Sequence, residues 1–282
     1  MDTTAMLVIA IVAVILALWL GSPAPPLPQA PSPNMSPPAP TTTTYTGQNL
    51  TVAAWNLQVW GPSKASQSGL VARVLQTLQD YDIVFVQEIR DESDTHDAFA
   101  ALCSNMTGYK CGLSSRAGRT QVKEQYGLLY RDTLVLSEWA DYNPDPADRW
   151  ERPPIKTKWH FNNYDLTIYT LHAKPTAVAA ELHNLENMIN NTGNVIVIGD
   201  LNAACLYYTP DQDSSFDTWF WAIRDDQRTN LAAEGCAYDR ILLNADAAQE
   251  YVAATVTTTS LNSTVSDHYP VSVTLRPTET LT

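Results

Sequence analysis

The segment from Leu50 to Ile89 constrains the fold most, because it contains a strand, a helix and a strand in succession. "LTVAAWNL" and "DIVFVQEI" are short apolar runs with the length of buried strands. Between them, "SGLVARVLQTLQDY" places apolar residues at helical spacing, namely Leu70, Val74, Leu75 and Leu78. This order predicts an α/β domain.

The rest of the chain extends this pattern without a repeat or an internal linker. "YGLLYR", "TLVLSEW", "IKTKWHF" and "DLTIYTLHA" follow one another without helices, which favours antiparallel pairing. A second helical segment, "AVAAELHNLENMIN", precedes the strands "NVIVIGDLN", "DRILLN" and "YPVSVTL". We therefore expect one domain over residues 47–276, with two sheets packed together and helices outside.

The N-terminal region is of a different kind. Residues 5–21, "AMLVIAIVAVILALWLG", are apolar and uncharged, so residues 1–21 are interpreted as a signal peptide or an N-terminal membrane anchor. Residues 22–46 form a Pro/Thr-rich linker that cannot bury a core, and residues 277–282 form a C-terminal tail. The expected product is extracellular, either secreted or membrane-anchored facing the exterior.

Charge is distributed unevenly along the chain. All 17 Lys and Arg residues follow Gly61, and from Lys64 onward 17 positive and 29 negative side chains give a formal charge of −12. Such a domain lacks the general attraction for nucleic acid that a basic domain has. If it acts on a polyanion, a local cationic site or a bound metal must supply the attraction.

Four cysteines fit an exported protein with two disulfides, and Cys103 and Cys111 lie close together in sequence. The alternative is four reduced thiols in the core of a cytosolic protein. The sequence contains no C-x-x-C pair that would suggest zinc.

Five N-x-S/T triplets begin at Asn34, Asn49, Asn105, Asn190 and Asn262. Such triplets are common by chance in a chain rich in Asn and Thr, so from the sequence they are weak evidence for glycosylation.

Polar residues follow several of the apolar strands, and their types are those of phosphoester chemistry. These residues are Asn56, Glu88, His172, Asp200, Asn202, Asp239, Asp267 and His268. Taken singly, each is more often a solvated turn residue or a satisfied core group. Together at strand ends they indicate a functional site. Their hard oxygen ligands select Mg²⁺, Mn²⁺ or Ca²⁺ over zinc. Two histidines oriented by carboxylates can act as general base and general acid.

The motifs that carry these residues resemble those of a known family. "AAWNL", "YDIVFVQEIRD", "LHAKP", "GDLNAAC", "CAYDRI" and "SDHYPV" occur in the order found in the deoxyribonuclease I family, within the endonuclease/exonuclease/phosphatase superfamily. The resemblance spans Leu50 to Leu275, and "CAYDRI" is specific to the deoxyribonucleases. It implies a four-layer αββα sandwich of two mixed, largely antiparallel sheets. It also implies divalent-metal-dependent endonucleolytic cleavage of double-stranded DNA.

The resemblance further implies a role for each motif residue. His172 and His268 are the acid–base pair, with Glu124 and Asp239 as their respective partners. The metal site comprises Glu88, Asn56 and Asp267, and the catalytic groups around the scissile phosphate are Asp200 and Asn202. Arg90 and Arg152, together with Asn56 and Asn202, contact phosphate. A Cys205–Cys236 disulfide is implied beside Cys103–Cys111. The cofactor is Mg²⁺, with Mn²⁺ as an alternative and the Ca²⁺ requirement left open.

The chain also departs from the family pattern. Val122 stands where the family places an aromatic residue against the minor groove, and Gln58 where it has an Arg. Arg228 replaces a calcium-binding carboxylate, so that calcium site is expected to be lost, and no residue pattern supports the alternative of a second calcium site near Asp148. The actin-binding segment is replaced by "YKCGLSS", so actin is not an expected partner, and nothing requires more than a monomer.

Two alternatives to a nuclease stay open. The same histidines and acids serve phosphatases or phosphodiesterases that act on lipid-like or inositol phosphate substrates. A non-catalytic binding protein is disfavoured, because no catalytic position carries a disabling substitution.

Overall fold

The computed structural model describes residues 49–93, 96–161, 164–208, 213–233, 235–259 and 261–278. The expected signal peptide or anchor (1–21) and the Pro/Thr-rich linker (22–46) lie outside these residues, as does most of the C-terminal tail. Within the described part, no helix has the length and apolar character needed to cross a membrane.

The first sheet has six strands in the order β11-β12-β1-β2-β4-β3. These strands are β1 (Leu50–Trp60), β2 (Ile83–Ile89), β3 (Tyr109–Leu113), β4 (Gln125–Arg131), β11 (Tyr251–Val256) and β12 (Val271–Leu275). Only β1 and β2 pair in parallel, and the helix between them makes this possible. The other pairs in this sheet are antiparallel.

The second sheet also has six strands, in the order β5-β6-β7-β8-β10-β9. They are β5 (Val135–Asp141), β6 (Ile155–Phe161), β7 (Tyr164–Thr170), β8 (Asn194–Asp200), β9 (Phe220–Trp221) and β10 (Asp239–Leu243). β7 and β8 pair in parallel, and the remaining pairs are antiparallel. The expectation of two mixed, largely antiparallel sheets is confirmed.

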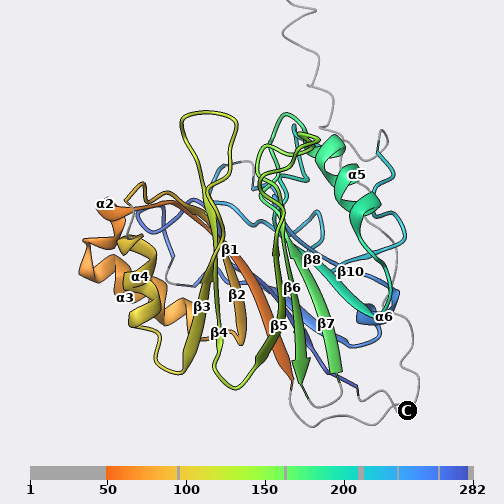
Figure 1. Cartoon of the computed structure of the whole chain (residues 1–282), viewed down its shortest axis with the longest axis horizontal. Coiled ribbons are helices and arrows are strands. Elements are labelled where there is room, and N and C mark those ends of the chain that lie inside the picture. The colour runs from red at the N-terminus through yellow and green to blue at the C-terminus, as the bar shows by residue number, and fades with distance from the viewer. Residues whose placement is uncertain are drawn as a thin grey trace, which may run out of the picture.

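Helices cover the outer faces of the two sheets (Figure 1). The first sheet carries α2 (Pro62–Ala65), α3 (Ser68–Leu78) and α4 (Asp97–Ser104), and the second carries α5 (Val178–Met188), with the short α6 (Ala245–Ala248) after β10. Leu70, Val74 and Leu78 form the buried face of α3 and belong to the same apolar cluster as Trp55 of β1. A separate cluster, which includes Phe85 and Ile198, fills the space between the sheets. The four layers αββα are therefore confirmed.

Burial on both faces explains why the central strands are continuous apolar runs rather than alternating ones. β2 and β8 are buried along nearly their whole length. The structure adds elements that the hydrophobic pattern did not predict. These are the edge strands β3, β9 and β11 and the helices α2, α4 and α6.

The strand directions bring the polar strand ends to one end of the sandwich. β1 and β2 are parallel, so Asn56 and Glu88 follow the same sheet edge. In the second sheet, β8 and β10 are antiparallel with Asp200 directly opposite Asp239. Gly199 allows this packing, because a Cβ there would collide with the carbonyl oxygen of Leu171, and its φ of +143° is one that L side chains rarely adopt.

Both expected disulfides are present. Cys103–Cys111 joins α4 to β3, and Cys205–Cys236 joins the loop after β8 to the segment before β10. The described chain has no free cysteine. The second disulfide closes a loop between Asp200 and Asp239, so it restrains two segments that carry polar strand-end residues.

Candidate active site

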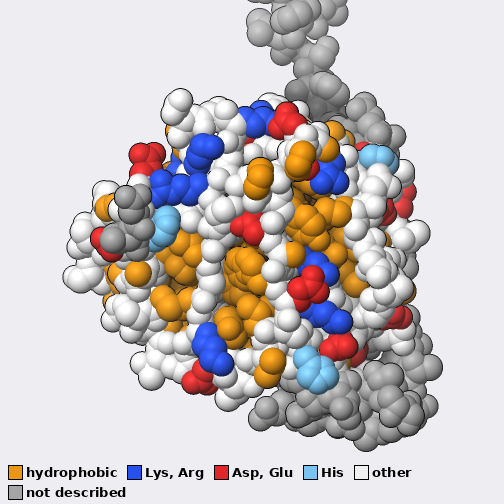
Figure 2. Space-filling model, viewed as in Figure 1, with side chains coloured by type: hydrophobic (Ala, Val, Ile, Leu, Met, Phe, Trp, Pro, Cys, Tyr) orange, Lys and Arg blue, Asp and Glu red, His pale blue; other side chains and the backbone are white. Residues whose placement is uncertain are grey.

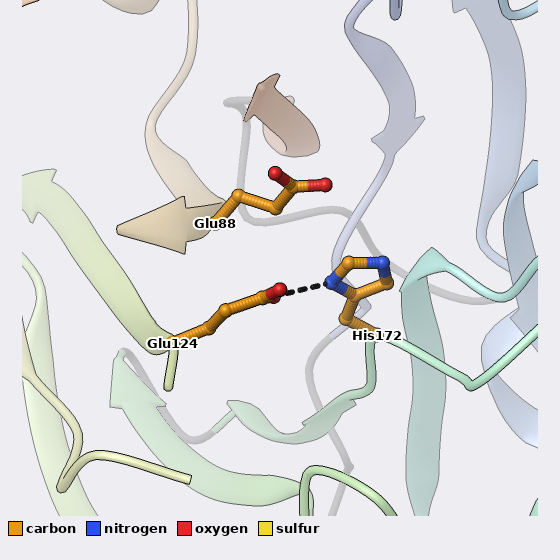
Figure 3. Close-up of side chains that lie close together, drawn as sticks. All are labelled: Glu88, Glu124 and His172. Atoms are coloured by element: carbon orange, nitrogen blue, oxygen red, sulfur yellow. Dashed lines mark hydrogen bonds and ion pairs between the residues drawn. The ribbon is translucent and has the colours of Figure 1, made fainter. Parts of the chain in front are cut away.

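The first histidine pair joins the two sheets. His172 follows β7 and Glu124 precedes β4, and Nδ1 of His172 lies 2.8 Å from Oε2 of Glu124 (Figure 3). Both side chains are 7% exposed. The backbone N–H of His172 donates to the hydroxyl of Tyr126 at 2.9 Å, which fixes the position of the His172 backbone from which the ring extends. The other ring nitrogen, Nε2, is therefore the one that faces the centre of the site.

Two arginines surround Glu124. Nη2 of Arg90 lies 2.7 Å from Oε1 of Glu124, and Nη1 of Arg152 lies 3.4 Å from the same oxygen. Burial by itself would raise the pKa of Glu124. The hydrogen bond with His172 and the charges of His172, Arg152 and Arg90 outweigh it and lower the pKa to about 2. Glu124 is thus a fixed anion at neutral pH.

The second histidine pair has the same geometry and a different electrostatic environment. His268, three residues before β12, places Nδ1 2.8 Å from Oδ2 of Asp239, the first residue of β10. Burial would lower the pKa of His268, but the charges of Asp239 and Asp200 and the hydrogen bond with Asp239 raise it to about 10. Burial raises the pKa of Asp239, and the nearby Asp200 charge adds to this. The His268–Asp239 pair therefore retains a proton at neutral pH.

Asp200 lies between the two pairs. Its Oδ2 is 3.5 Å from Nε2 of His172 and 3.6 Å from Nε2 of His268. Burial opposes ionisation of Asp200, but the charges of His268 and His172 lower its pKa, helped by hydrogen bonds from Asn56 and Asn202. The side-chain amide of Asn202 donates to the carbonyl of Ala173 at 3.0 Å, so it holds the loop after His172. One carboxylate thus links both histidines.

Glu88 is held at the edge of this cluster by strained backbone. Its φ is 60°, in the left-handed region that non-glycine residues rarely adopt. Oε1 accepts from Nδ2 of Asn56 at 3.0 Å, and Oε2 accepts from the N–H of Val59 at 3.0 Å. Gln58 and Val59 are also left-handed, at φ 46° and 58°, where β1 bulges. The bulge turns backbone N–H groups toward Asn56 and Glu88.

The donor set of this region suits a hard cation. Two groups of acid and histidine ligands lie within reach of a single ion in the described chain: Glu88 with Glu124 and His172, and Asp200 with Asp239 and His268. Glu124 and Asp239 are each bound to a histidine, whereas the part-exposed Glu88 contacts Asn56, the N–H of Val59 and Arg90 but no histidine. Asn56 is in direct contact with Glu88, and Asp267 is half-exposed with Oδ1 4.0 Å from Nε2 of His268. Carboxylate and amide oxygens fit Mg²⁺ or Mn²⁺ better than zinc.

The remaining predicted residues lie as follows. Arg90 and Arg152 both reach the site, but in the structure their guanidinium groups bind Glu124. Val122 is exposed on the loop before Glu124. The carboxylate of Asp148 binds Nε of Arg119 at 2.7 Å, and Arg228 donates to the backbone carbonyls of Asn230 and Ala232.

Several supporting residues were not found from the sequence. Lys64 places its Nζ 2.9 Å from the carbonyl of Leu57 and 2.8 Å from that of Val265. It therefore ties the end of β1 to the loop that precedes Asp267. A lysine just after a strand gives no sequence signal for such a role. Ser266 is a second case: its hydroxyl donates to Asn56 O at 2.6 Å and accepts from the N–H of His268 at 3.0 Å.

Comparison with known proteins places this fold and site in one class. The sequence profile of the endonuclease/exonuclease/phosphatase family matches residues 53–268. The chain belongs to this family and, within it, to the deoxyribonuclease I-like proteins. It is 32% identical over 264 residues to human deoxyribonuclease-1, covering 81% of this chain and 93% of the relative. Deoxyribonuclease-1 of Gallus gallus is 30% identical, with 80% and 92% covered.

Solved structures agree on the fold. A truncated TDP2 from Caenorhabditis elegans matches with a TM-score of 0.61 at 14% identity, covering 83% of this chain and 100% of that one. A mannosyl-6-phosphatase from Bacteroides thetaiotaomicron matches with a TM-score of 0.57 at 19% identity, covering 79% and 98%. At these identities the likeness extends to the architecture alone. Family membership makes the chain a hydrolase, and its architecture is shared with a protein named as a mannosyl-6-phosphatase.

Proposed function

We propose that this protein is a divalent-metal-dependent endonuclease that hydrolyses phosphodiester bonds of double-stranded DNA. The observation that supports it most is the pair of histidine–carboxylate contacts whose free Nε2 atoms both lie within 3.6 Å of one Asp200 oxygen. The likeness to deoxyribonuclease-1 over most of both chains favours DNA as the substrate.

In the proposed reaction, each group of site residues has a separate role. His172 and His268 act as the acid–base pair, one taking a proton from the attacking water and the other giving one to the leaving oxygen. Glu124 and Asp239 hold the Nδ1 atoms, so both Nε2 atoms face the scissile phosphate. Asp200 and Asn202 lie around that phosphate. Glu88, Asn56 and Asp267 would hold Mg²⁺ or Mn²⁺, which when bound offsets the developing phosphate charge.

Substrate attraction has to be local. On the face drawn in Figure 2, Lys and Arg are interspersed with Asp and Glu rather than forming one continuous cationic surface. Arg90, 28% exposed, sits between Glu88 and Glu124 and is the cation best placed to meet an incoming phosphate. Arg152 is 13% exposed and lies beside it, with contacts to the carbonyl of His172 at 3.0 Å and to Glu124 at 3.4 Å. A metal at Glu88 would add to this local attraction.

The two disulfides also support an export route, since such bonds persist in oxidising compartments. We therefore propose that residues 47–276 act outside the cell as the catalytic domain. Residues 1–21 would serve as signal or anchor, residues 22–46 as linker and residues 277–282 as tail. Intact-mass analysis of the mature protein in membrane and soluble fractions tests which N-terminal fate applies.

The test of the activity is a nicking assay with supercoiled plasmid, using the full-length protein with Mg²⁺, with Mn²⁺ and with chelator. His172→Ala and His268→Ala should each lower the rate about 10²–10⁴-fold, the usual contribution of a general acid or base. His183→Ala is the matched control, because His183 is exposed on α5. Its rate should equal that of the wild type.

Two results would reject the proposal. One is nicking that survives chelator, and the other is nicking that both active-site histidine variants retain in full. Phosphate release from inositol lipids or sugar phosphates by the same preparation, without nicking, would assign the site to a phosphatase instead.

A further inference from the structure

Four of the five N-x-S/T triplets lie in the described part of the chain, and in all four the asparagine is exposed. Asn105 follows α4 and Asn190 follows α5 in the loops that lead to β3 and β8, and Asn262 opens the turn before Val265. A folded chain can carry a bulky glycan only where the acceptor side chain faces water, and surface turns are where such acceptors occur. Asn49 leads directly into β1, and Thr51 of its triplet is bound to Asp82, so the inference concerns the three turns.

Local hydrogen bonds leave the acceptor nitrogens accessible. In the Asn262 triplet, Oδ1 accepts from the N–H and the hydroxyl of Thr264, which is an Asx turn. In the Asn190 triplet, Oδ1 accepts from the hydroxyl of Thr192 at 3.1 Å. Nδ2 of Asn105 donates to the carbonyl of Ala101 at 2.7 Å. An amide nitrogen that gains a sugar keeps one hydrogen, so this bond can persist.

Two of the three turns lie at the end of the sandwich opposite the candidate active site. The residue next to Asn190 accepts from Asn244, which follows β10, whereas Asp239 begins β10 about 17 Å away at strand spacing. Gly108, three residues after Asn105, contacts Asp132 beyond the end of β4. Glu124 precedes the other end of β4, about 26 Å from Asp132 at strand spacing. Glycans at Asn105 and Asn190 would therefore leave the active-site end open.

Asn262 has the opposite placement. Its carbonyl accepts from the N–H groups of Val265 and Ser266 at 2.9 and 3.2 Å. Ser266 in turn bonds to Asn56 and His268. A glycan at Asn262 would stand at the rim of the active site, on the loop that holds Asp267 and His268.

We propose that Asn105, Asn190 and Asn262 are N-glycosylation sites, and that the Asn262 glycan limits access of long DNA to the active site. The modification transfers an oligosaccharide from an isoprenoid pyrophosphate carrier. Nδ2 attacks the anomeric carbon, the bond from that carbon to the pyrophosphate breaks, a nitrogen–carbon bond forms and the amide releases one proton. The two disulfides agree with passage through an exporting membrane, where such carriers occur. The effect on access rests on the proposed nuclease function, and the modification itself does not.

The site assignment is tested by secreting the full chain from a host that performs N-glycosylation, then removing glycans with an amidase in ¹⁸O water. Mass spectrometry should find labelled Asp at positions 105, 190 and 262. Thr107→Ala, Thr192→Ala and Thr264→Ala should each abolish one labelled site, and Thr264→Ser, which keeps the triplet, should retain its label. Asn184, partly exposed on α5 and outside any triplet, is the internal control. Unlabelled peptides from a host that labels a reporter glycoprotein would overturn the assignment.

The access claim has its own readout. Deglycosylated wild type and Thr264→Ser are compared with their glycosylated forms on plasmid and on a short oligonucleotide duplex. The glycosylated forms should nick plasmid several-fold more slowly while cleaving the short duplex equally well. Thr192→Ala should not change this ratio. Equal plasmid rates would overturn the access claim, and absence of cleavage of either substrate would instead reject the proposed nuclease.

Discussion

The two histidine–carboxylate pairs are close to identical in geometry, yet the protein surrounds them with opposite charges. Each has a 2.8 Å contact from Nδ1 to a carboxylate, and each bridges the two sheets. Glu124 is flanked by Arg90 and Arg152 and has a pKa of about 2, whereas Asp239 is flanked by Asp200 and has a raised pKa. The distance between a histidine and its carboxylate therefore does not by itself set the protonation of the pair. The charged residues around each pair set its protonation.

The largest expected effect comes from removing the carboxylate of either pair. Asp239→Asn and Glu124→Gln should each lower plasmid nicking about 10²–10⁴-fold, because the imidazole loses the anion that orients it. Asp239→Asn should cost more, since Asp239 contributes most to the raised pKa of His268. Single-turnover nicking at saturating Mg²⁺ measures this. Loss of less than tenfold in both variants would contradict the assignment of these carboxylates.

The second prediction concerns the free energy of unfolding as a function of pH. Measured with chelator present, it should differ between the two histidine–carboxylate pairs. Glu124 is depressed from 4.5 to about 2, so its contribution exists above about pH 4.5 and is lost as pH falls toward 2. His268 is raised from 6.5 to about 10, so its contribution exists below about pH 6.5 and is lost as pH rises toward 10. Urea unfolding across this range should show both declines. Glu124→Gln should flatten the decline in acid, and Asp239→Asn should flatten the decline in alkali. An unchanged profile in either variant would show that its pair does not cause the pH dependence.

A smaller effect is expected from the arginines of the first pair. Arg152→Met removes the bond from Nε to the carbonyl of His172 at 3.0 Å and should destabilise the fold by about 1.5–3 kcal/mol. Arg90→Met, at a more exposed position, should cost less stability and raise the KM for DNA more. Urea midpoints and nicking kinetics of the two variants check this. Equal KM values would argue against Arg90 as a phosphate contact.

The smallest expected effect concerns the link between the metal side and the second pair. Lys64→Met breaks the contacts to Leu57 and Val265, so it should cost about 1–2 kcal/mol and reduce nicking several-fold. Lys156→Met is the matched control, since Lys156 on β6 forms an ion pair with the exposed Glu138. Differential scanning calorimetry and nicking rates measure both. If the two lysine variants behaved alike, Lys64 would have no special positioning role.

Much of the fold could be predicted from the sequence because the central strands have a clear hydrophobic pattern. β1, β2 and β8 are largely buried and consist mainly of apolar residues, and their C-terminal halves carry the polar site residues Asn56, Glu88 and Asp200. The edge strand β3, "YKCGL", is half-buried and shows no clear alternation, so the pattern does not reveal it. Hydrophobic patterns reveal buried segments, and an edge strand such as β3 is too little buried to produce such a pattern.

The electrostatic details of the site could not be read in the same way. Arg90 and Arg152 were expected to contact phosphate, but only the packed structure shows that both also bind Glu124. The acceptors of Lys64 are backbone carbonyls, one of them 201 residues away. No residue type marks a backbone acceptor, so such a contact has no signature in the sequence. Residue identities predict the chemistry of a site, and tertiary packing sets its charge state.

The pairing of Asp200 with Asp239 across β8 and β10 has a consequence for how the protein is made. A slip of one residue would turn Asp239 to the opposite face of the sheet and present the neighbouring Arg240 to His268 instead. Such a chain would keep both sheets and the same secondary structure content, yet it would have no carboxylate for its second histidine. Specific activity per mole of folded protein is therefore a measure of register fidelity during folding, which circular dichroism alone would not detect.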